Sequence, residues 1–266
     1  MRWSRARRIV PALAAAALVL ALAGLATAAP VQSGELRVSV STRLSPYRLP
    51  RSGAAPITAH IAGHVAAVDG GVPPQLTDLD ILVNRHGHFN TSGLPSCGLS
   101  RLQPGTNARA LKECGASLVG SGHFWASVVF SENRPYHTTG RLMIFAGRRG
   151  SEPVIFAHIY TTQPFPTSFV VTFAIHQIHQ GPWGTELSAS LPSALGNWGF
   201  VDRIKLNLGR TFHLAGGAEK GFLEAGCPAP AGTDTVVFPL ARADLSFADG
   251  EELATTITKP CGVTKE

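Results

Sequence analysis

The sequence predicts an all-β protein, an antiparallel β-sandwich of immunoglobulin-like or jelly-roll type with one short helix. Many segments alternate apolar and polar residues with a period of two, which is typical of strands that bury one face. Glycine and proline are abundant, at 28 and 19 of 266 residues, while charged residues make up only 15%. This composition favours many short strands joined by tight turns.

The individual strands follow from the pattern of each segment. Half-buried strands are predicted at 36–41, 78–84, 118–130, 203–208, 236–247 and 253–258. The runs 154–160 and 169–175 are apolar on both faces, as in central strands of a covered sheet. Gly120 and Gly122 share the apolar face of their strand, which predicts a bulge or a closely packed neighbour. The apolar phase changes beside Pro239, which predicts a bulge or a strand that crosses between sheets.

Turns and one helix connect these strands. Glycine-containing turn signals lie between strand candidates at 70–71, 147–150, 216–217 and 249–250. A helix is predicted over 107–114, with Thr106 as its N-cap and Gly115 just past its end.

The first 28 residues are typical of a secretory signal peptide. A basic start with Arg7 and Arg8 precedes an apolar run at 9–25, and small residues stand before Ala29. The alternative is an N-terminal membrane anchor, which Pro11 and the mildly apolar, alanine-rich run disfavour. We therefore expect a signal peptide at 1–28, a secreted or cell-envelope-associated protein and no transmembrane span after its removal. The mature chain, 29–266, is predicted to be a single sandwich domain, or alternatively two with a boundary near 131–140.

The charge of the mature chain is close to balanced. Removal of the leader leaves 19 basic and 17 acidic residues, so the formal charge falls from +6 to +2. The sequence contains no cluster of lysine and arginine of the kind that a nucleic-acid-binding face requires. We therefore expect no nucleic-acid partner.

The four cysteines predict disulfides, because an even number in an exported chain is typical of crosslinks. Three pairings are possible, and Cys97–Cys114 with Cys227–Cys261 is favoured because each closes a local loop. Each bridge is expected to stabilise the fold by roughly 3 kcal/mol. A metal site is the alternative, but no C-x-x-C spacing supports it.

Histidine pairs are the candidate metal ligands. His86 and His88 would point to the same face of a strand, and so would His60 and His64 if 57–68 is a strand. A metal would need a third ligand from elsewhere in the chain. The alternative is that these are scattered surface or hydrogen-bonded histidines.

Tryptophan is the candidate for ligand binding. Trp183 and Trp198 lie in a glycine- and proline-rich region, with Trp125 in a long strand, and exposed tryptophans can stack against sugars. The alternative is that they are packing residues. No catalytic residue is predicted, since the serine of Gly120-Ser121-Gly122-His123 lacks the spacing of a nucleophile turn. No phosphate-binding loop is present, and no cofactor is expected.

Two segments carry a resemblance. The sequence Gly93-Leu94-Pro95-Ser96-Cys97, followed after the predicted helix by 114–122, resembles a group of uncharacterised exported proteins of high-GC actinobacteria. The resemblance covers roughly 76–125. It implies export and the Cys97–Cys114 pairing, and it implies no activity and no catalytic residues.

These observations favour a non-enzymatic protein with a structural or binding role, whose partner is a cell-envelope polymer or another envelope protein. One alternative is an extracellular hydrolase of polysaccharide or ester bonds, which would need two titratable groups in one cleft. A second alternative is an exported metal-binding protein that uses His86 and His88.

Overall fold

Most of the chain forms one large, curled sheet. The computed structural model describes residues 26–27, 30–129, 134–191, 199–214 and 216–264. Its 14-stranded sheet contains β1 (Ala26–Thr27), β2 (Val31–Ser33), β3 (Leu36–Ser45), β4 (Arg48–Leu49), β6 (Thr58–Ala67), β7 (Leu76–Asn84), β9 (Leu118–Val128), β10 (Tyr136–Arg149), β11 (Glu152–Thr161), β12 (Thr167–Gln180), β13 (Trp183–Ser190), β14 (Gly199–Leu208), β18 (Thr235–Phe247) and β19 (Glu252–Val263). The all-β prediction is therefore confirmed.

In the described ranges, two small sheets and three helical segments complete the fold. The strands β15 (Thr211–His213) and β16 (Glu219–Gly221) form one sheet, and β5 (Ala55–Pro56), β17 (Leu223–Ala225) and β8 (Gly87–Phe89) form the other. The helical segments are α1 (Leu99–Leu102), α2 (Asn107–Cys114) and the 3-10 turn η1 (Gly115–Ser117). No helix in the described part of the chain is long and apolar enough to cross a membrane.

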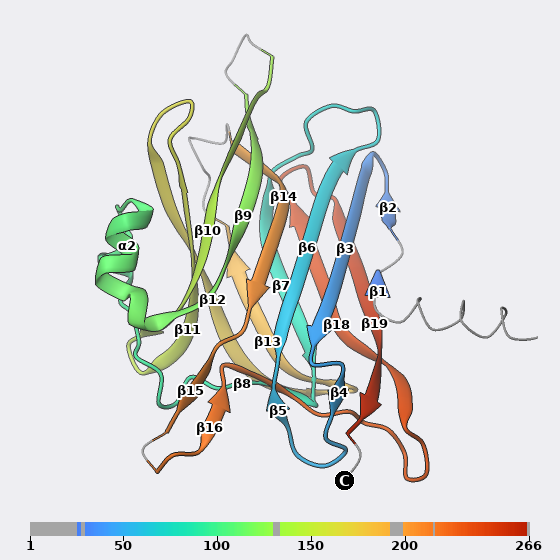
Figure 1. Ribbon diagram of the computed structural model, residues 1–266. Helices are drawn as coiled ribbons and strands as arrows, with labels where there is room; N and C mark the ends of the chain where they lie inside the picture. Colours follow the sequence, from blue (N-terminus) through green and yellow to red (C-terminus); the bar gives the residue numbers. More distant parts are fainter. Residues whose placement is uncertain (1–25, 28–29, 130–133, 192–198, 215, 265–266) are drawn as a thin grey trace, which may run out of the picture.

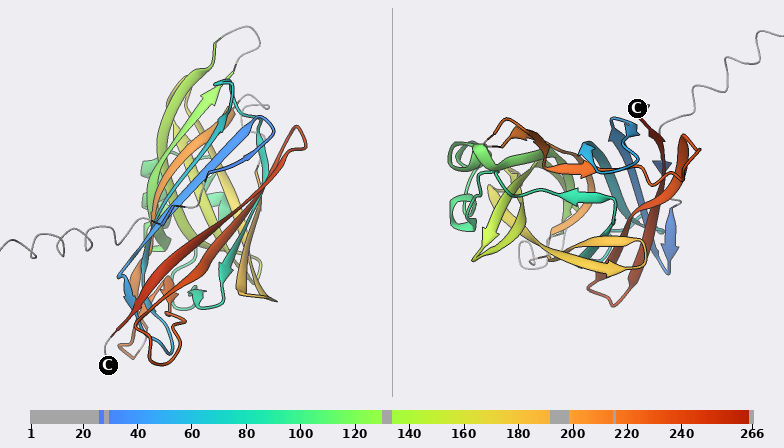
Figure 2. Two further views of the ribbon diagram at one scale, coloured as in Figure 1. Left: turned by 90° about the vertical axis from the view of Figure 1, so that its right-hand side faces the viewer. Right: turned by 90° about the horizontal axis from the view of Figure 1, so that it is seen from below.

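The order of strands in the large sheet is β1-β3-β6-β14-β9-β10-β11-β12-β13-β7-β18-β19-β4, with β2 beside β3. All pairings are antiparallel except β19 with β4. The sheet curls so strongly that its two ends meet, as the end-on view in Figure 2 shows. The buried Lys259 of β19 donates a hydrogen bond to the carbonyl oxygen of Thr42 in β3 at 3.0 Å.

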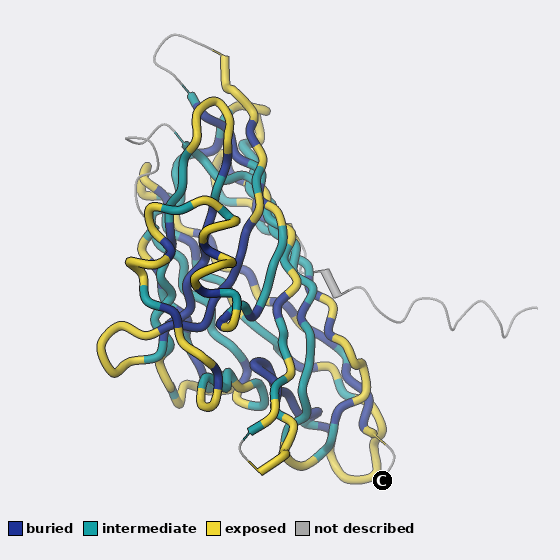
Figure 3. Tube along the Cα trace, turned by 60° about the vertical axis from the view of Figure 1, so that its left-hand side comes forward, coloured by how far each residue is buried: buried dark blue, intermediate teal, exposed yellow. Residues whose placement is uncertain are grey.

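The core lies inside this curl (Figure 3). Apolar side chains of opposite parts of the sheet, such as Phe124 of β9 and Leu187 of β13, belong to one buried cluster. The layered packing expected of a sandwich is thus achieved within a single folded-over sheet. Strands β9 and β10 pair directly, so the sheet continues across the alternative domain boundary near 131–140.

Local predictions from the sequence are met at several points. The helix α2 begins after Thr106, whose hydroxyl accepts a hydrogen bond from the Arg109 amide at 3.2 Å. The strand β18 shifts register between Pro239 and Ala241, as the phase change predicts. A Cβ on Gly122 would lie 2.8 Å from the Cα of Leu206, so β14 is the closely packed neighbour.

Both predicted disulfides form. The Cα atoms of Cys97 and Cys114 lie 5.6 Å apart, and those of Cys227 and Cys261 lie 5.8 Å apart, within the range that a disulfide can bridge. The first bridge holds α2 over the outer faces of β10 and β11, where a second apolar cluster includes Phe145. This cover explains why β11 is apolar on both faces.

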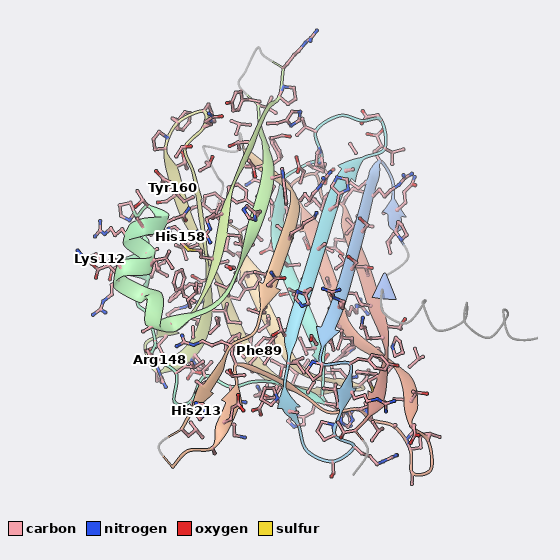
Figure 4. The ribbon with its side chains drawn as sticks, viewed as in Figure 1. Phe89, Lys112, Arg148, His158, Tyr160 and His213 are labelled. Atoms are coloured by element: carbon pink, nitrogen blue, oxygen red, sulfur yellow. A yellow bond between two sulfur atoms is a disulfide. The ribbon has the colours of Figure 1, made fainter. Side chains whose placement is uncertain are left out.

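A fully buried histidine lies beneath this helical cover. Figure 4 places His158 of β11 on the sheet side of α2, with Lys112 on the outward side. The Nε2 atom of His158 lies 3.0 Å from the carbonyl oxygen of Gly105, and Nδ1 has no partner in the described part of the chain. Burial lowers the pKa of His158 below its ordinary value of 6.5, outweighing the hydrogen bond to Gly105. His158 is therefore neutral at pH 7.

Candidate functional site: a basic outer face

Five neighbouring strands present a common outer face to solvent. The strands β3, β6, β14, β9 and β10 are adjacent in the sheet and face the viewer in Figure 1. Side chains alternate across a sheet, and the inward residues of these strands belong to the core clusters. The outward set is rich in arginine, lysine and histidine. We call it the basic face, and it consists of Arg37, Arg43, His60, His64, His123, Trp125, Arg141, Arg203 and Lys205.

Register, not sequence proximity, gathers these charges. One row across the sheet pairs Lys205 with His123 and His123 with Arg141. The next row pairs His64 with Arg203 and Arg203 with Trp125. Adjacent strands lie about 4.8 Å apart, so each row places several cationic or titratable side chains within a short span.

Trp125 lies at the centre of the basic face. Its ring is half-buried, and the guanidinium carbon of Arg203 lies 5.8 Å from the ring centroid. The Nζ atom of Lys205 lies 5.9 Å from the same ring, and the His123 ring lies at 6.3 Å. Cations at this distance are attracted to the negative face of an aromatic ring. The face therefore combines positive charge with an aromatic surface.

A hollow of about 280 Å³ opens beside Trp125. A register shift between Val201 and Arg203 inserts Asp202 as an extra residue of β14, and such bulges redirect a side chain. The hollow is lined by His64, Trp125, Ala126, His137, Thr138, Asp202 and Arg203. Titratable groups from three strands, β6, β10 and β14, therefore meet beside the Trp125 ring of β9.

A buried serine supports two of these groups. The Ser127 hydroxyl donates a hydrogen bond to the Asp202 carboxylate at 3.2 Å. The Nδ1 atom of His137 lies 3.2 Å from the Ser127 hydroxyl oxygen. In a hydrolase triad the histidine lies between serine and carboxylate and takes the hydroxyl proton. Here the serine lies between the other two, and its proton is directed to Asp202. Ser127 therefore bridges His137 and Asp202, and this arrangement differs from the serine–histidine–carboxylate order of a catalytic triad.

The opposite outer face of the sheet is acidic. On β7, β13 and β18 the outward residues form what we call the acidic face, namely Asp78, Asp80, Glu186 and Asp244. Asp80 and Asp244 are direct cross-strand partners. Burial, then the charges of Asp244 and Asp78, raise the pKa of Asp80 above 3.8, while His176 opposes this. Arg242 neutralises part of the face through a 2.8 Å ion pair with Asp244.

The two predicted histidine pairs lie in different kinds of structure. His60 and His64 both lie on the strand β6, as the prediction required, and both belong to the basic face. The Nδ1 atom of His60 lies 2.6 Å from the side-chain oxygen of Asn207. His86 instead lies in the turn before β8, which contains His88. His86 and His88 therefore do not lie on one strand, which the predicted same-face arrangement assumed.

Burial, then the charges of Arg85 and His88, lower the pKa of His86. Within the described ranges, no group of three or more histidine, cysteine, aspartate or glutamate side chains could hold a metal ion. The metal hypothesis thus gains no third ligand there.

Of the tryptophans considered, Trp125 and Trp183 lie on different strands, β9 and β13. Trp183 is half-buried at the start of β13, and Trp198 lies outside the described residues. Among the described tryptophans, Trp125 lines the hollow of the basic face. The sequence signal for it was the polar half of β9, in which His123, Trp125 and Ser127 alternate with core residues. That signal could not show which cations lie beside the ring.

No family model, curated protein or solved structure matches this chain. Functional inference therefore depends on the geometry of the basic face.

Proposed function

We propose that this chain is an exported, cell-envelope-associated binding protein without enzymatic activity, and that its basic face binds an acidic polymer of the envelope. The observation that carries the proposal is the gathering of cationic side chains around Trp125 on one outer face. Within the described residues Asp202 is the acidic side chain at this face. An extended anionic chain matches such a surface because repeated charges can contact several strands at once.

Two further features support a binding role. The basic side chains come from regular strands, which hold a binding surface more rigidly than loops do. The disulfides and the absence of a membrane-crossing helix among the described residues are compatible with an extracellular or envelope location. The order of Ser127, His137 and Asp202 is unsuited to serine catalysis, which favours binding over hydrolysis at this place.

The test is co-sedimentation of the purified exported chain with isolated envelopes of its host. We expect the wild-type protein to pellet at low salt and to be released at high salt, because screening weakens exposed charge interactions. The variant Arg203→Glu/Lys205→Glu should lose most of this binding. The control Arg148→Glu/Arg149→Glu makes the same charge change at the β10–β11 turn and should still pellet.

Each measurement has a result that would refute one part of the proposal. Equal pelleting of the two double variants would refute the basic face as the binding surface. Wild-type protein that stays in solution at low salt would refute envelope binding itself. Circular dichroism of each variant shows whether the fold is retained.

A further inference from the structure

The hollow beside Trp125 has the size and chemistry of a subsite for a single sugar. We propose that it binds one carboxylated sugar residue of an acidic polysaccharide, an inference that rests on the proposed function and names its ligand class. The hollow measures about 280 Å³, just below the range of roughly 300–1,000 Å³ found for small-molecule pockets. Its volume therefore suits one sugar ring and is too small for a folded partner.

Trp125 offers the surface on which a sugar ring can stack. A tryptophan side chain combines a large apolar face with a ring N–H donor, and a pyranose likewise has an apolar C–H face and polar edges. The residue is half-buried in β9, and the pairing of β9 with β14 and β10 fixes its place in the sheet.

Arg203 and His64 provide the recognition of a carboxylate. The two residues are cross-strand partners and both line the hollow. Arg203 makes no salt bridge within the described part of the chain, and its contact there is with the Trp125 ring. A planar guanidinium can donate two parallel hydrogen bonds to a carboxylate. A sugar stacked on Trp125 would present its carboxylate to this fork.

Asp202 distinguishes an acidic sugar from other anions. One oxygen of its carboxylate accepts the Ser127 hydroxyl, which leaves the other oxygen free to accept sugar hydroxyls. Asp202 repels any anion, but inorganic polyphosphate has no hydroxyl donors whose hydrogen bonds could offset that repulsion. The combination of an arginine fork, an aromatic face and a carboxylate acceptor therefore selects a ligand that carries both a carboxylate and hydroxyl groups.

The experiment measures binding of the full exported chain to three polymers by isothermal titration calorimetry. The probes are polygalacturonate, which carries carboxylated sugars, inorganic polyphosphate, which carries charge without sugar, and uncharged dextran. We expect the tightest binding to polygalacturonate, weaker binding to polyphosphate and none to dextran. Titration with monomeric galacturonate should change the intrinsic fluorescence of the wild-type protein.

Three variants locate the subsite. Trp125→Leu should reduce affinity for polygalacturonate about tenfold, a loss typical of removing one stacking aromatic, and should abolish the fluorescence response. Asp202→Asn should narrow the preference for polygalacturonate over polyphosphate, because it removes a repulsive charge. The matched control Trp183→Leu, in β13, should alter neither property. Thermal unfolding of each variant shows whether it folds.

The outcomes separate the subsite from the proposed function. Equal affinity for polygalacturonate and polyphosphate, unchanged by Trp125→Leu in a folded variant, would overturn the sugar subsite and leave the binding of acidic polymers standing. Failure to bind either charged polymer would overturn both proposals.

Discussion

The two outer faces of the curled sheet both place like charges near one another, but the charges are spaced differently on each. On the basic face, arginine and lysine have long side chains whose charged ends reach solvent, and histidine, serine and alanine stand between them in the rows. On the acidic face, Asp80 and Asp244 lie directly opposite each other on short side chains. Burial, and then the neighbouring charges of Asp244 and Asp78, raise the pKa of Asp80. Like charges therefore accumulate with less strain where their side chains are long.

The two faces also make the charge distribution of the molecule asymmetric. Positive side chains lie on one side of the sheet and acidic ones on the other, so the molecule has an electric dipole across its thickness. Such a field orients a protein as it approaches a charged surface. An acidic polymer would meet the basic face first, which is the face that contains the hollow at Trp125.

The largest expected effect is on stability, and it tests whether α2, which the Cys97–Cys114 bridge holds on the sheet, is independent of binding at the basic face. The variant Cys97→Ser/Cys114→Ser should lower the free energy of unfolding by about 3 kcal/mol through the loss of loop closure, measured by urea denaturation. Polygalacturonate affinity should stay within twofold, since Trp125 and Arg203 lie on strands outside the crosslinked loop. Unchanged stability would contradict the role of the bridge in holding the cover.

A second prediction contrasts the salt dependence of the two faces. Raising the salt from 50 to 200 mM should weaken polygalacturonate binding roughly tenfold, because ions compete for several contacts at once. The variant Asp78→Asn/Asp244→Asn should change the affinity less than twofold, measured by calorimetry at each salt concentration. A larger effect from this variant would mean that the acidic face takes part in binding.

A third prediction compares the buried histidine with the exposed ones. The pKa of His158 is lowered in the folded state, so the unfolded chain takes up this proton first as the pH falls below 6.5. Stability due to neutral His158 is complete above pH 6.5 and is lost as the pH falls toward the folded pKa. The urea midpoint of His158→Gln should therefore decline less between pH 7.5 and 5 than that of the wild type.

The glutamine of this variant can still donate to the Gly105 carbonyl oxygen, so the comparison isolates the proton. Parallel pH profiles for wild type and variant would show that His158 does not titrate on unfolding. The histidines of the basic face are the same in both proteins and cancel in the difference.

The smallest expected effect is on the acidic face. Asp80→Asn should raise stability at pH 7 by about 0.5 kcal/mol, because like charges directly opposite each other are destabilising. Because the pKa of Asp80 is raised in the folded state, ionisation of Asp80 opposes folding as the pH rises above its ordinary pKa of 3.8. Differential scanning calorimetry should show a gain of about 1–2 °C. The gain should vanish at low pH, where the carboxylates are protonated, and a gain that persists there would require another cause.

Much of the fold could be predicted from the sequence, because local rules determine it. Thr106 and Gly115 mark the ends of α2, since capping depends on neighbouring residues alone. The phase change beside Pro239 predicts a bulge, since side chains alternate within one strand. The short loops between cysteines favour the pairs that form. These features need no knowledge of which strands are neighbours.

The candidate site was decided by the tertiary structure. Arg43, His64, Arg203 and Arg141 are far apart in the chain, and no run of basic residues predicted that they share a face. Their meeting depends on the strand order β3-β6-β14-β9-β10, in which β14 is inserted between strands that precede it by many residues. Alternation could show that each side chain points outward. Only the pairing of strands, a long-range property of the packed chain, decides which outward side chains lie side by side.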